Sequence, residues 1–229
     1  MSLANIHHDI ITCSRCERLR TYCGEIARTK RAAFRQDIYW GKPVPGFGDP
    51  DARVLVLGLA PAAHGANRTG RVFTGDGAGA SGDFLMAAMH QHGFANIPTS
   101  QSIDDGLMLK DAYIAAAVRC APPDNKPTTE EIHACQPHLE AELAHLPNVR
   151  VVVALGKIAF DVWWKVRASK GVFMKPRPSF SHGAICKPPS GPIVIASYHP
   201  SRQNTNTGKL TPSMMASVFR KAARLRSES

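Results

Sequence analysis

Four short apolar runs, separated by helical patterns, constrain the fold more than any other feature of this sequence. They are residues 53–57, 113–118, 149–155 and 192–196. Each is short and rich in small or branched apolar side chains, which is typical of a buried strand. The main helical patterns occupy residues 83–92, 128–146, 157–168 and 212–226. Strands that alternate with helices favour a parallel, doubly wound sheet. We therefore predict an α/β fold, with a three-layer α/β/α arrangement around a central four-stranded, mainly parallel sheet.

The remaining stretches fit this arrangement as one unit. Residues 1–50 form an N-terminal segment with helix-like portions around its first two cysteines, and residues 170–191, rich in Pro, Gly and Lys, are predicted to be an irregular insertion. Thr128 precedes Glu131 by three positions, a capping-box pattern that marks the start of a helix. With no internal repeat and no clear boundary, we expect a single domain over residues 1–229.

The loop after the first predicted strand has the most distinctive sequence, GLAPAAHGANRTGRVFTGD at 58–76. Ligands of open α/β sheets bind beyond the carboxyl ends of the strands, and glycines there let the backbone approach a ligand closely. This loop contains one aromatic ring, Phe73, and one carboxylate, Asp76. We expect both side chains to face a small planar ligand.

The net charge of +10 is unevenly distributed along the chain. Between Asp161 and Glu228 there is no acidic residue, but there are twelve lysines and arginines. A basic surface of this kind suits a polyanion, because neutralised phosphates release their counterions. The pattern favours a nucleic-acid partner over a basic face that serves only solubility.

Four of the six cysteines have spacings that suit a shared ligand. They are the pair Cys13 and Cys16, in a C-x2-C motif, and the wider pair Cys120 and Cys135. Four thiolates bind either a tetrahedral zinc ion or a 4Fe–4S cluster, and the wide second pair suits a cluster held from separate segments. Such a site is structural, because four protein ligands leave no open position. Cys23 and Cys186 are expected to be ordinary thiols.

Nothing in the sequence indicates a membrane or an export route. No apolar run approaches the roughly 20 residues that span a bilayer, and the N-terminus lacks the apolar region of a signal peptide. We expect a monomer in the bacterial or archaeal cytoplasm, associated with the nucleoid and without a membrane partner.

Three motifs together resemble the type-b, or family 5, branch of the uracil-DNA glycosylase superfamily. They are the 58–76 loop, RCAPPDNKP at 119–127 and HPSRQNTNTGKLT at 199–211. The resemblance covers most of the chain from Cys13 to Thr211 and includes the four-cysteine arrangement. It implies the uracil-DNA glycosylase fold, removal of uracil and related deaminated bases from DNA to leave an abasic site, and a structural 4Fe–4S cluster.

The chemistry of such an enzyme gives roles to particular residues. A glycosylase flips its target base out of the duplex, stacks it and reads its edge, and we predict that Phe73 stacks the base. Asp76 is predicted to stabilise the oxocarbenium-like sugar or to orient the attacking water. His199 is predicted to donate to O2 of the departing base. The resemblance places Asn125 near the base or the catalytic water.

Two apolar positions distinguish this branch within the superfamily. A related iron–sulfur branch usually has a glutamate at the position of Leu59 and a base-reading asparagine at the position of Ala116. Without those polar groups, we expect a permissive pocket that also admits hypoxanthine or modified uracils.

The other site assignments concern the first and third motifs. Residues assigned with Phe73 to the base pocket are Gly58, Ala60, His64 and Asn67, and those assigned to DNA are Arg68, Arg202, Gln203 and Asn204. For His64, Asn67 and Arg68, shaping the loop is an equal alternative. The third motif offers no apolar wedge, so its polar residues are expected to fill the gap left by the flipped base.

Two motif matches are set aside, and one rival function remains. GAGASG at 77–82 fits a dinucleotide fingerprint but begins about twenty residues after its strand, where the required context is lost. The sequence HLE at 138–140 fits half of a zinc-deaminase signature without the second half. The rival is a non-enzymatic, zinc-stabilised module that binds nucleic acid through its basic half.

Overall fold

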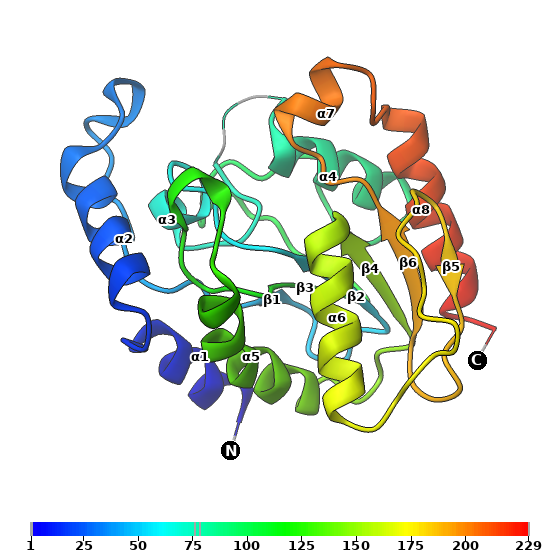
Figure 1. Cartoon of the computed structure of the whole chain (residues 1–229). Coiled ribbons are helices and arrows are strands. Elements are labelled where there is room, and N and C mark those ends of the chain that lie inside the picture. Colours follow the sequence, from blue (N-terminus) through cyan, green and yellow to red (C-terminus); the bar gives the residue numbers. More distant parts are fainter. Residues whose placement is uncertain (1, 76, 78, 229) are drawn as a thin grey trace.

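The structure is a computed structural model that describes residues 2–75, 77 and 79–228 (Figure 1). The strands of this part of the chain are β1 (Phe47–Gly48), β2 (Val54–Gly58), β3 (Ala112–Ala116), β4 (Val151–Leu155), β5 (Ile185–Cys186) and β6 (Ile193–Ser197). The longer helices are α1 (Leu3–Ile11), α2 (Glu17–Thr29), α4 (Ser81–Gln91), α5 (Thr129–Ala144), α6 (Lys157–Ser169) and α8 (Pro212–Leu225). Short helical segments are η1 (Ala32–Phe34), α3 (Ala66–Thr69), η2 (Pro123–Asn125) and α7 (Arg202–Asn206).

One sheet organises the molecule, with the strand order β1-β3-β2-β4-β6-β5. The four central strands are parallel, and at their carboxyl ends Gly58 pairs with Ala116 and Leu155 with Ser197. The edge strands β1 and β5 are antiparallel to their neighbours and two residues long. The predicted α/β fold with four central parallel strands is confirmed. The sheet is wider than expected, because it includes the two edge strands as well. A strand of two residues is too short to show an alternating pattern, so the sequence did not predict these two.

Helices cover both faces of the sheet, as Figure 1 shows. Val54 and Val56 of β2 pack in a core that includes residues of α4 and α8, whereas Leu55 and Leu57 pack in a core with α5 and α6. Every residue of β2, β3 and β4 is buried. Burial on both faces explains why these strands appear in the sequence as continuous apolar runs.

The direction of the connections reverses between β2 and β4. From β2 the chain passes through α4 to β3 on one side, and from β4 it passes through α6 to β6 on the other. A reversal of this kind opens a crevice at the carboxyl ends of the strands. The 58–76 loop follows β2 and the 199–211 motif follows β6, so the sheet brings both motifs to the same end.

Local signals account for several element boundaries. The Thr128 hydroxyl accepts the Glu131 N–H at 3.2 Å, and the Glu131 carboxylate accepts the Thr128 N–H at 2.8 Å, so the predicted capping box is present. The segment 170–191, predicted to be irregular throughout, contains the edge strand β5. Across the described residues, no helix has the length and apolar content that a membrane crossing requires.

Candidate active site

Phe73 has a left-handed backbone conformation with a φ of 51°, which is a genuine outlier for a bulky residue. Two glycines make room for it. A Cβ at Gly58 would lie 2.9 Å from the Phe73 ring, and a Cβ at Gly82 would lie 2.3 Å from its carbonyl oxygen. The ring therefore lies directly against the end of β2, on backbone that carries no side chain.

His199 lies beside this ring. The two ring centroids are 5.7 Å apart with an angle of 31° between the planes, and the Asn204 amide donates to the His199 carbonyl at 2.8 Å. Burial lowers the pKa of His199 to about 4, so the imidazole is neutral at physiological pH and keeps one N–H donor. An aromatic face next to a neutral donor suits a planar polar ring.

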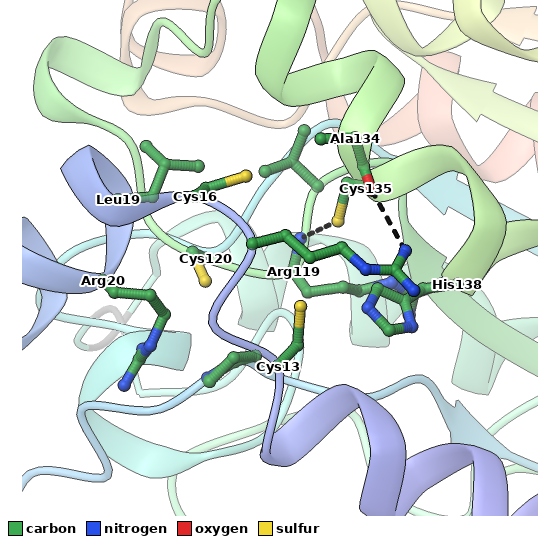
Figure 2. Close-up of a pocket in the computed structure, with 12 residues that line it drawn as sticks. Cys13, Cys16, Leu19, Arg20, Arg119, Cys120, Ala134, Cys135 and His138 are labelled. Carbon is green, nitrogen blue, oxygen red and sulfur yellow. Dashed lines mark hydrogen bonds between the residues drawn. The ribbon is translucent and has the colours of Figure 1, made fainter.

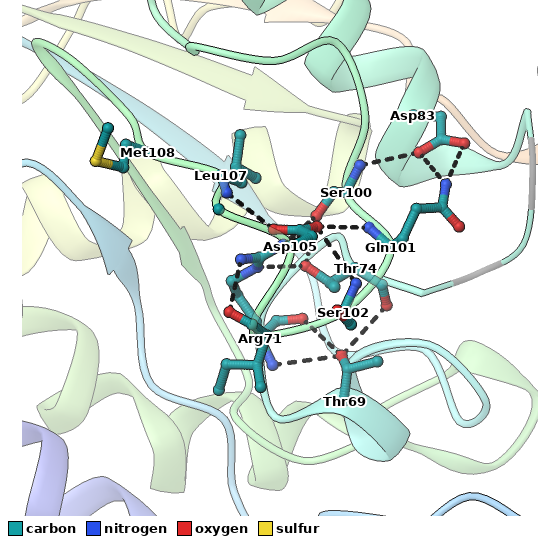
Figure 3. Close-up of polar contacts among 12 residues, drawn as sticks. Thr69, Arg71, Thr74, Asp83, Ser100, Gln101, Ser102, Asp105, Leu107 and Met108 are labelled. Atoms are coloured by element: carbon teal, nitrogen blue, oxygen red, sulfur yellow. Dashed lines mark hydrogen bonds and ion pairs between the residues drawn. The ribbon is translucent and has the colours of Figure 1, made fainter.

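A buried polar cluster holds the end of the 58–76 loop (Figure 3). Arg71 is 4% exposed. Its guanidinium donates to Thr74 Oγ1 at 2.9 Å, Ser100 Oγ at 3.1 Å and Asp105 Oδ2 at 2.7 Å. The Ser100 carbonyl accepts the N–H of Gly75 at 2.9 Å. The cluster thus fixes the N–H side of Gly75.

Arg68 holds the carbonyl side of the same glycine. Its Nη2 donates to the Gly75 carbonyl at 2.5 Å, its Nη1 donates to the Asp37 carboxylate, and the Phe34 ring lies 4.0 Å from its guanidinium carbon. Gly75 has a φ of +77°, a conformation that glycine adopts without strain. The residue just before Asp76 is therefore held from two sides. Asp76 itself lies outside the described residues.

On the far side of Asp76, the chain approaches α7. A Cβ at Gly77 would lie 3.2 Å from Arg202 Nη2, so the Arg202 guanidinium lies against this part of the loop. Arg202 and Gln203 are exposed, whereas Asn204 is partly buried and holds the His199 backbone.

Asn125 lies on η2, with an exposed side chain and a φ of 57°. Asp124 before it is also left-handed, at 53°. Two consecutive left-handed residues other than glycine are strained, and such strain concentrates at functional sites. Figure 1 shows this segment, in green above α5, at the end of the sheet where α3 lies.

The other residues assigned to the 58–76 loop have internal contacts. Asn67 is fully buried, and its amide donates to the Cys23 carbonyl at 3.3 Å. The His64 Nδ1 lies 3.1 Å from the Tyr39 hydroxyl. Ala60 is partly buried and packs beside the cysteine-rich core. For Asn67 and Arg68, these contacts favour the alternative in which they shape the loop.

The four cysteines with ligand spacing converge on one cavity, and Figure 2 shows their sulfur atoms around a common space. Cys13 and Cys16 come from the segment between α1 and α2, Cys120 follows β3, and Cys135 lies on α5. The Arg119 N–H donates to the Cys135 sulfur at 3.3 Å, and burial raises the pKa of that thiol to about 12. Cys186 lies on β5, outside this group.

Cationic and donor groups line the same cavity. Arg119 is 1% exposed and donates to Glu142 at 2.7 Å through Nη2, but its Nε and Nη1 are buried without a hydrogen-bond partner among the described residues. The Nε2 of His138 is also buried without a hydrogen-bond partner among the described residues. Arg15 and Arg20 also line the cavity. This environment suits an anionic group held by the sulfurs.

Several contacts that build the site have no signal in the sequence. Arg71 meets Asp105 across 34 positions, and Arg68 meets Asp37 across 31. Neither pair has a helical or strand spacing, so no periodicity connects them. A basic residue inside a glycine-rich loop was the only available hint.

Comparison with known proteins gives a consistent result. Residues 45–223 match the family described as the uracil DNA glycosylase superfamily. The type-5 uracil-DNA glycosylase of Thermus thermophilus is 51% identical over 216 residues, 94% of this chain and 94% of that protein. The protein of the same description from Mycobacterium leprae is 47% identical over 225 residues, 98% and 96% of the two chains. The one from Pyrobaculum aerophilum is 43% identical over 233 residues, 97% of each.

Proposed function

The chain belongs to the type-5 uracil-DNA glycosylases of the uracil-DNA glycosylase superfamily, and from this membership we propose how its own residues excise a base. The activity is hydrolysis of the N-glycosidic bond of uracil in DNA. Membership in an enzyme family sets aside the non-enzymatic module. The observation that carries the proposal is the Phe73–His199 ring pair over Gly58 at the carboxyl ends of the strands.

Phe73 stacks the flipped uracil. Its ring is held in place by a left-handed backbone and by the absence of a side chain at Gly58. Stacking of a base on an aromatic side chain contributes about 1–3 kcal/mol and does not depend on which base is present. The ring thus binds the base, and polar groups around it provide the chemistry.

His199 donates a hydrogen bond to the departing base. Uracil leaves with negative charge on its oxygen, and a fixed donor there lowers the barrier. Because burial holds the pKa of His199 near 4, the donor is a neutral imidazole throughout the physiological range. It therefore stabilises the leaving anion through a hydrogen bond and not through a full positive charge.

Asp76 supplies the carboxylate on the sugar side of the reaction. A fixed negative charge stabilises the oxocarbenium-like sugar, and the same group accepts a proton from the attacking water. The support is its place in the sequence, directly after Gly75, whose N–H and carbonyl are both held. Asn125, in its strained turn, is proposed to contact the base or this water.

The pocket accepts bases other than uracil. Ala116 ends β3 and pairs with Gly58, so the two paired strand ends beside the Phe73 ring carry only a methyl group and a hydrogen atom. Leu59 adds no polar group to the loop. A pocket without a strand-end amide has little means of rejecting hypoxanthine or modified uracils.

The four converging cysteines hold a structural 4Fe–4S cluster. Zinc requires four ligands at about 2.3 Å from one centre. An iron–sulfur cluster is larger than one zinc ion and holds its four cysteine ligands farther apart, which suits sulfur atoms arranged around a cavity. The Arg119 nitrogens that have no hydrogen-bond partner among the described residues fit the negative charge of such a cluster, as do the nearby Arg15 and Arg20. When bound, it would connect the N-terminal segment to β3 and α5.

The catalytic assignment is tested by single-turnover excision from a uracil-containing duplex. Asp76→Ala is expected to reduce the rate by about a hundredfold or more, with binding to an abasic-site duplex retained. Asp161→Ala on α6 is the matched acidic control and is expected to keep the wild-type rate. If Asp76→Ala excised uracil as fast as wild type, Asp76 would have no place in the mechanism.

In the same assay, failure of the wild type to excise hypoxanthine would refute the permissive pocket.

The cluster is tested by iron analysis and visible absorption of anaerobically purified protein. We expect a brown protein with about four iron atoms per chain. Cys120→Ser is expected to lose most of the iron and colour, whereas Cys186→Ser keeps both. A colourless, zinc-containing wild type would refute the cluster while leaving the excision reaction intact.

A further inference from the structure

The segment at residues 28–38, which we call the basic arm, contains the most exposed large apolar side chain among the described residues. Ile38 is 94% exposed, compared with 66% for Met108 and 62% for Phe173. A single exposed isoleucine on a free loop needs no explanation. The basic arm is not a free loop, however, because its Phe34 and Asp37 side chains contact Arg68 of the 58–76 loop.

One anchor precedes Ile38 directly. The Asp37 carboxylate and the Gly75 carbonyl both accept from the guanidinium of Arg68, and Phe34 packs on the face of the same group. The Arg68 guanidinium therefore bridges Asp37, the residue before Ile38, and Gly75, the residue before Asp76. The basic arm lies next to the reaction site.

A second anchor follows Ile38. The Tyr39 hydroxyl lies 3.1 Å from His64 Nδ1, and the Trp40 N–H donates to the Arg68 carbonyl at 2.8 Å. Ile38 is thus exposed at a point where the backbone is held on both sides by the 58–76 loop. An apolar side chain that is presented rigidly to solvent loses little further conformational entropy when it enters a partner.

The charge of the basic arm indicates the kind of partner. Arg28, Arg31 and Arg35 are exposed, and its one acid, Asp37, is already paired with Arg68. Burial lowers the pKa of His64, and the positive charges of Arg31 and Arg68 lower it further, so the Arg31 charge acts on the 58–76 loop. Figure 1 shows residues 30–38 (blue) and α7 (orange) at the same end of the sheet, on either side of that loop. A duplex engaged at the site meets positive charge on both flanks.

We propose that the basic arm is a second DNA-binding element of this enzyme, in which Ile38 enters the base stack beside the flipped nucleotide while Arg31 and Arg35 contact phosphates. Apolar side chains such as isoleucine serve as wedges between base steps, and the apolar side chains of the third motif, Pro200 and Leu210, are buried. The proposal rests on the excision reaction, so its test separates base flipping from bond cleavage.

The test compares single-turnover excision of uracil paired in a duplex with excision of uracil in the same strand unpaired. Ile38→Ala is expected to slow the duplex reaction by about tenfold and the unpaired reaction by less than about twofold. Phe173→Ala, an exposed apolar control in another loop, is expected to change neither. Ile38→Met, which keeps an apolar wedge, is expected to recover most of the duplex rate.

A second readout follows flipping without cleavage. 2-Aminopurine placed next to the uracil brightens when the stack opens, and its fluorescence on binding is expected to fall for Ile38→Ala. Equal loss on paired and unpaired uracil, or an unchanged duplex rate, would overturn the wedge. Asp76→Ala, by contrast, is expected to lose cleavage on both substrates and keep the fluorescence change.

The phosphate contacts have their own test. Arg35→Gln is expected to reduce the salt dependence of duplex binding, the slope of log K against log salt, by about one. Lys110→Gln, at an exposed lysine just before the start of β3 and so at the opposite end of that strand from the site, is the matched control and is expected to leave that slope unchanged. An unchanged slope for Arg35→Gln would remove Arg35 from the interface.

Discussion

At the scale of single residues, the site depends on a backbone conformation that most side chains avoid. Phe73 is held at a φ of 51°, which costs about 1–3 kcal/mol for a residue that is not glycine. Gly58 and Gly82 leave the space that its ring and carbonyl occupy. The anchors on both sides of Gly75 hold this strained backbone in place, so the Phe73 ring is already positioned for the base that we propose it stacks.

The protonation of His199 gives a prediction at the same scale. Its folded pKa of about 4 lies below the ordinary value of about 6.5, so the unfolded chain binds the proton more tightly. Folding stability is therefore lost as the pH falls from about 6.5 toward 4. We expect the NMR titration of the His199 ring, assigned with His199→Gln, to have a midpoint below about 5. A midpoint near 6.5 would mean that the imidazole is charged for part of the physiological range and that the neutral-donor account is wrong.

At the scale of elements, the buried cluster around Arg71 connects the 58–76 loop to the segment before β3. Burial alone raises the pKa of Asp105, but hydrogen bonds from Arg71, from the N–H groups of Leu107 and Gln101, and the Arg71 charge lower it to about 2. Asp105 therefore stabilises the fold at neutral pH, and this contribution disappears as the pH falls from about 4 toward 2.

Asp105→Asn is expected to lower the free energy of unfolding at pH 7 by about 3 kcal/mol, because it leaves the buried Arg71 without its charged partner. Denaturant unfolding measures this loss. Asp161→Asn, which affects the exposed pair with Lys157, is the control and is expected to change the free energy by less than about 1 kcal/mol. The difference between Asp105→Asn and wild type is expected to shrink as the pH approaches 2. A pH-independent difference would show that the charge of Asp105 is not the cause.

The elements also show what the sequence can and cannot predict. The four central strands and the capping box at Thr128 follow from short-range patterns, and the structure contains them. The strands β1 and β5 and the helices α3 and α7 were not predicted, because elements of two to five residues have no period. In the site, the convergence of the cysteines followed from spacing and topology. The anchors of Gly75 did not, because they depend on residues from distant segments: Ser100 accepts the Gly75 N–H, and Asp37 holds Arg68 from 31 positions away.

At the scale of the whole molecule, one end of the sheet gathers the residues that we propose act on DNA. The loop after β2 contributes Phe73, the motif after β6 contributes His199, and the basic arm and α7 flank them with positive charge. The cavity lined by the four cysteines lies to one side of this end. Its cysteines come from the N-terminal segment, which also contains the basic arm, from the residues after β3, and from α5. If the proposed cluster is present, its loss is therefore expected to loosen the basic arm before it alters the sheet.

We propose that uracil is excised while stacked on the Phe73 ring beside a neutral His199. The most direct test is the single-turnover rate of uracil excision by Phe73→Ala and Phe73→Tyr, with folding checked by thermal unfolding. Loss of the stacking surface is expected to slow Phe73→Ala by about tenfold to a hundredfold, and Phe73→Tyr, which keeps the ring, is expected to stay near wild type. A folded Phe73→Ala that excises uracil at the wild-type rate would contradict the account.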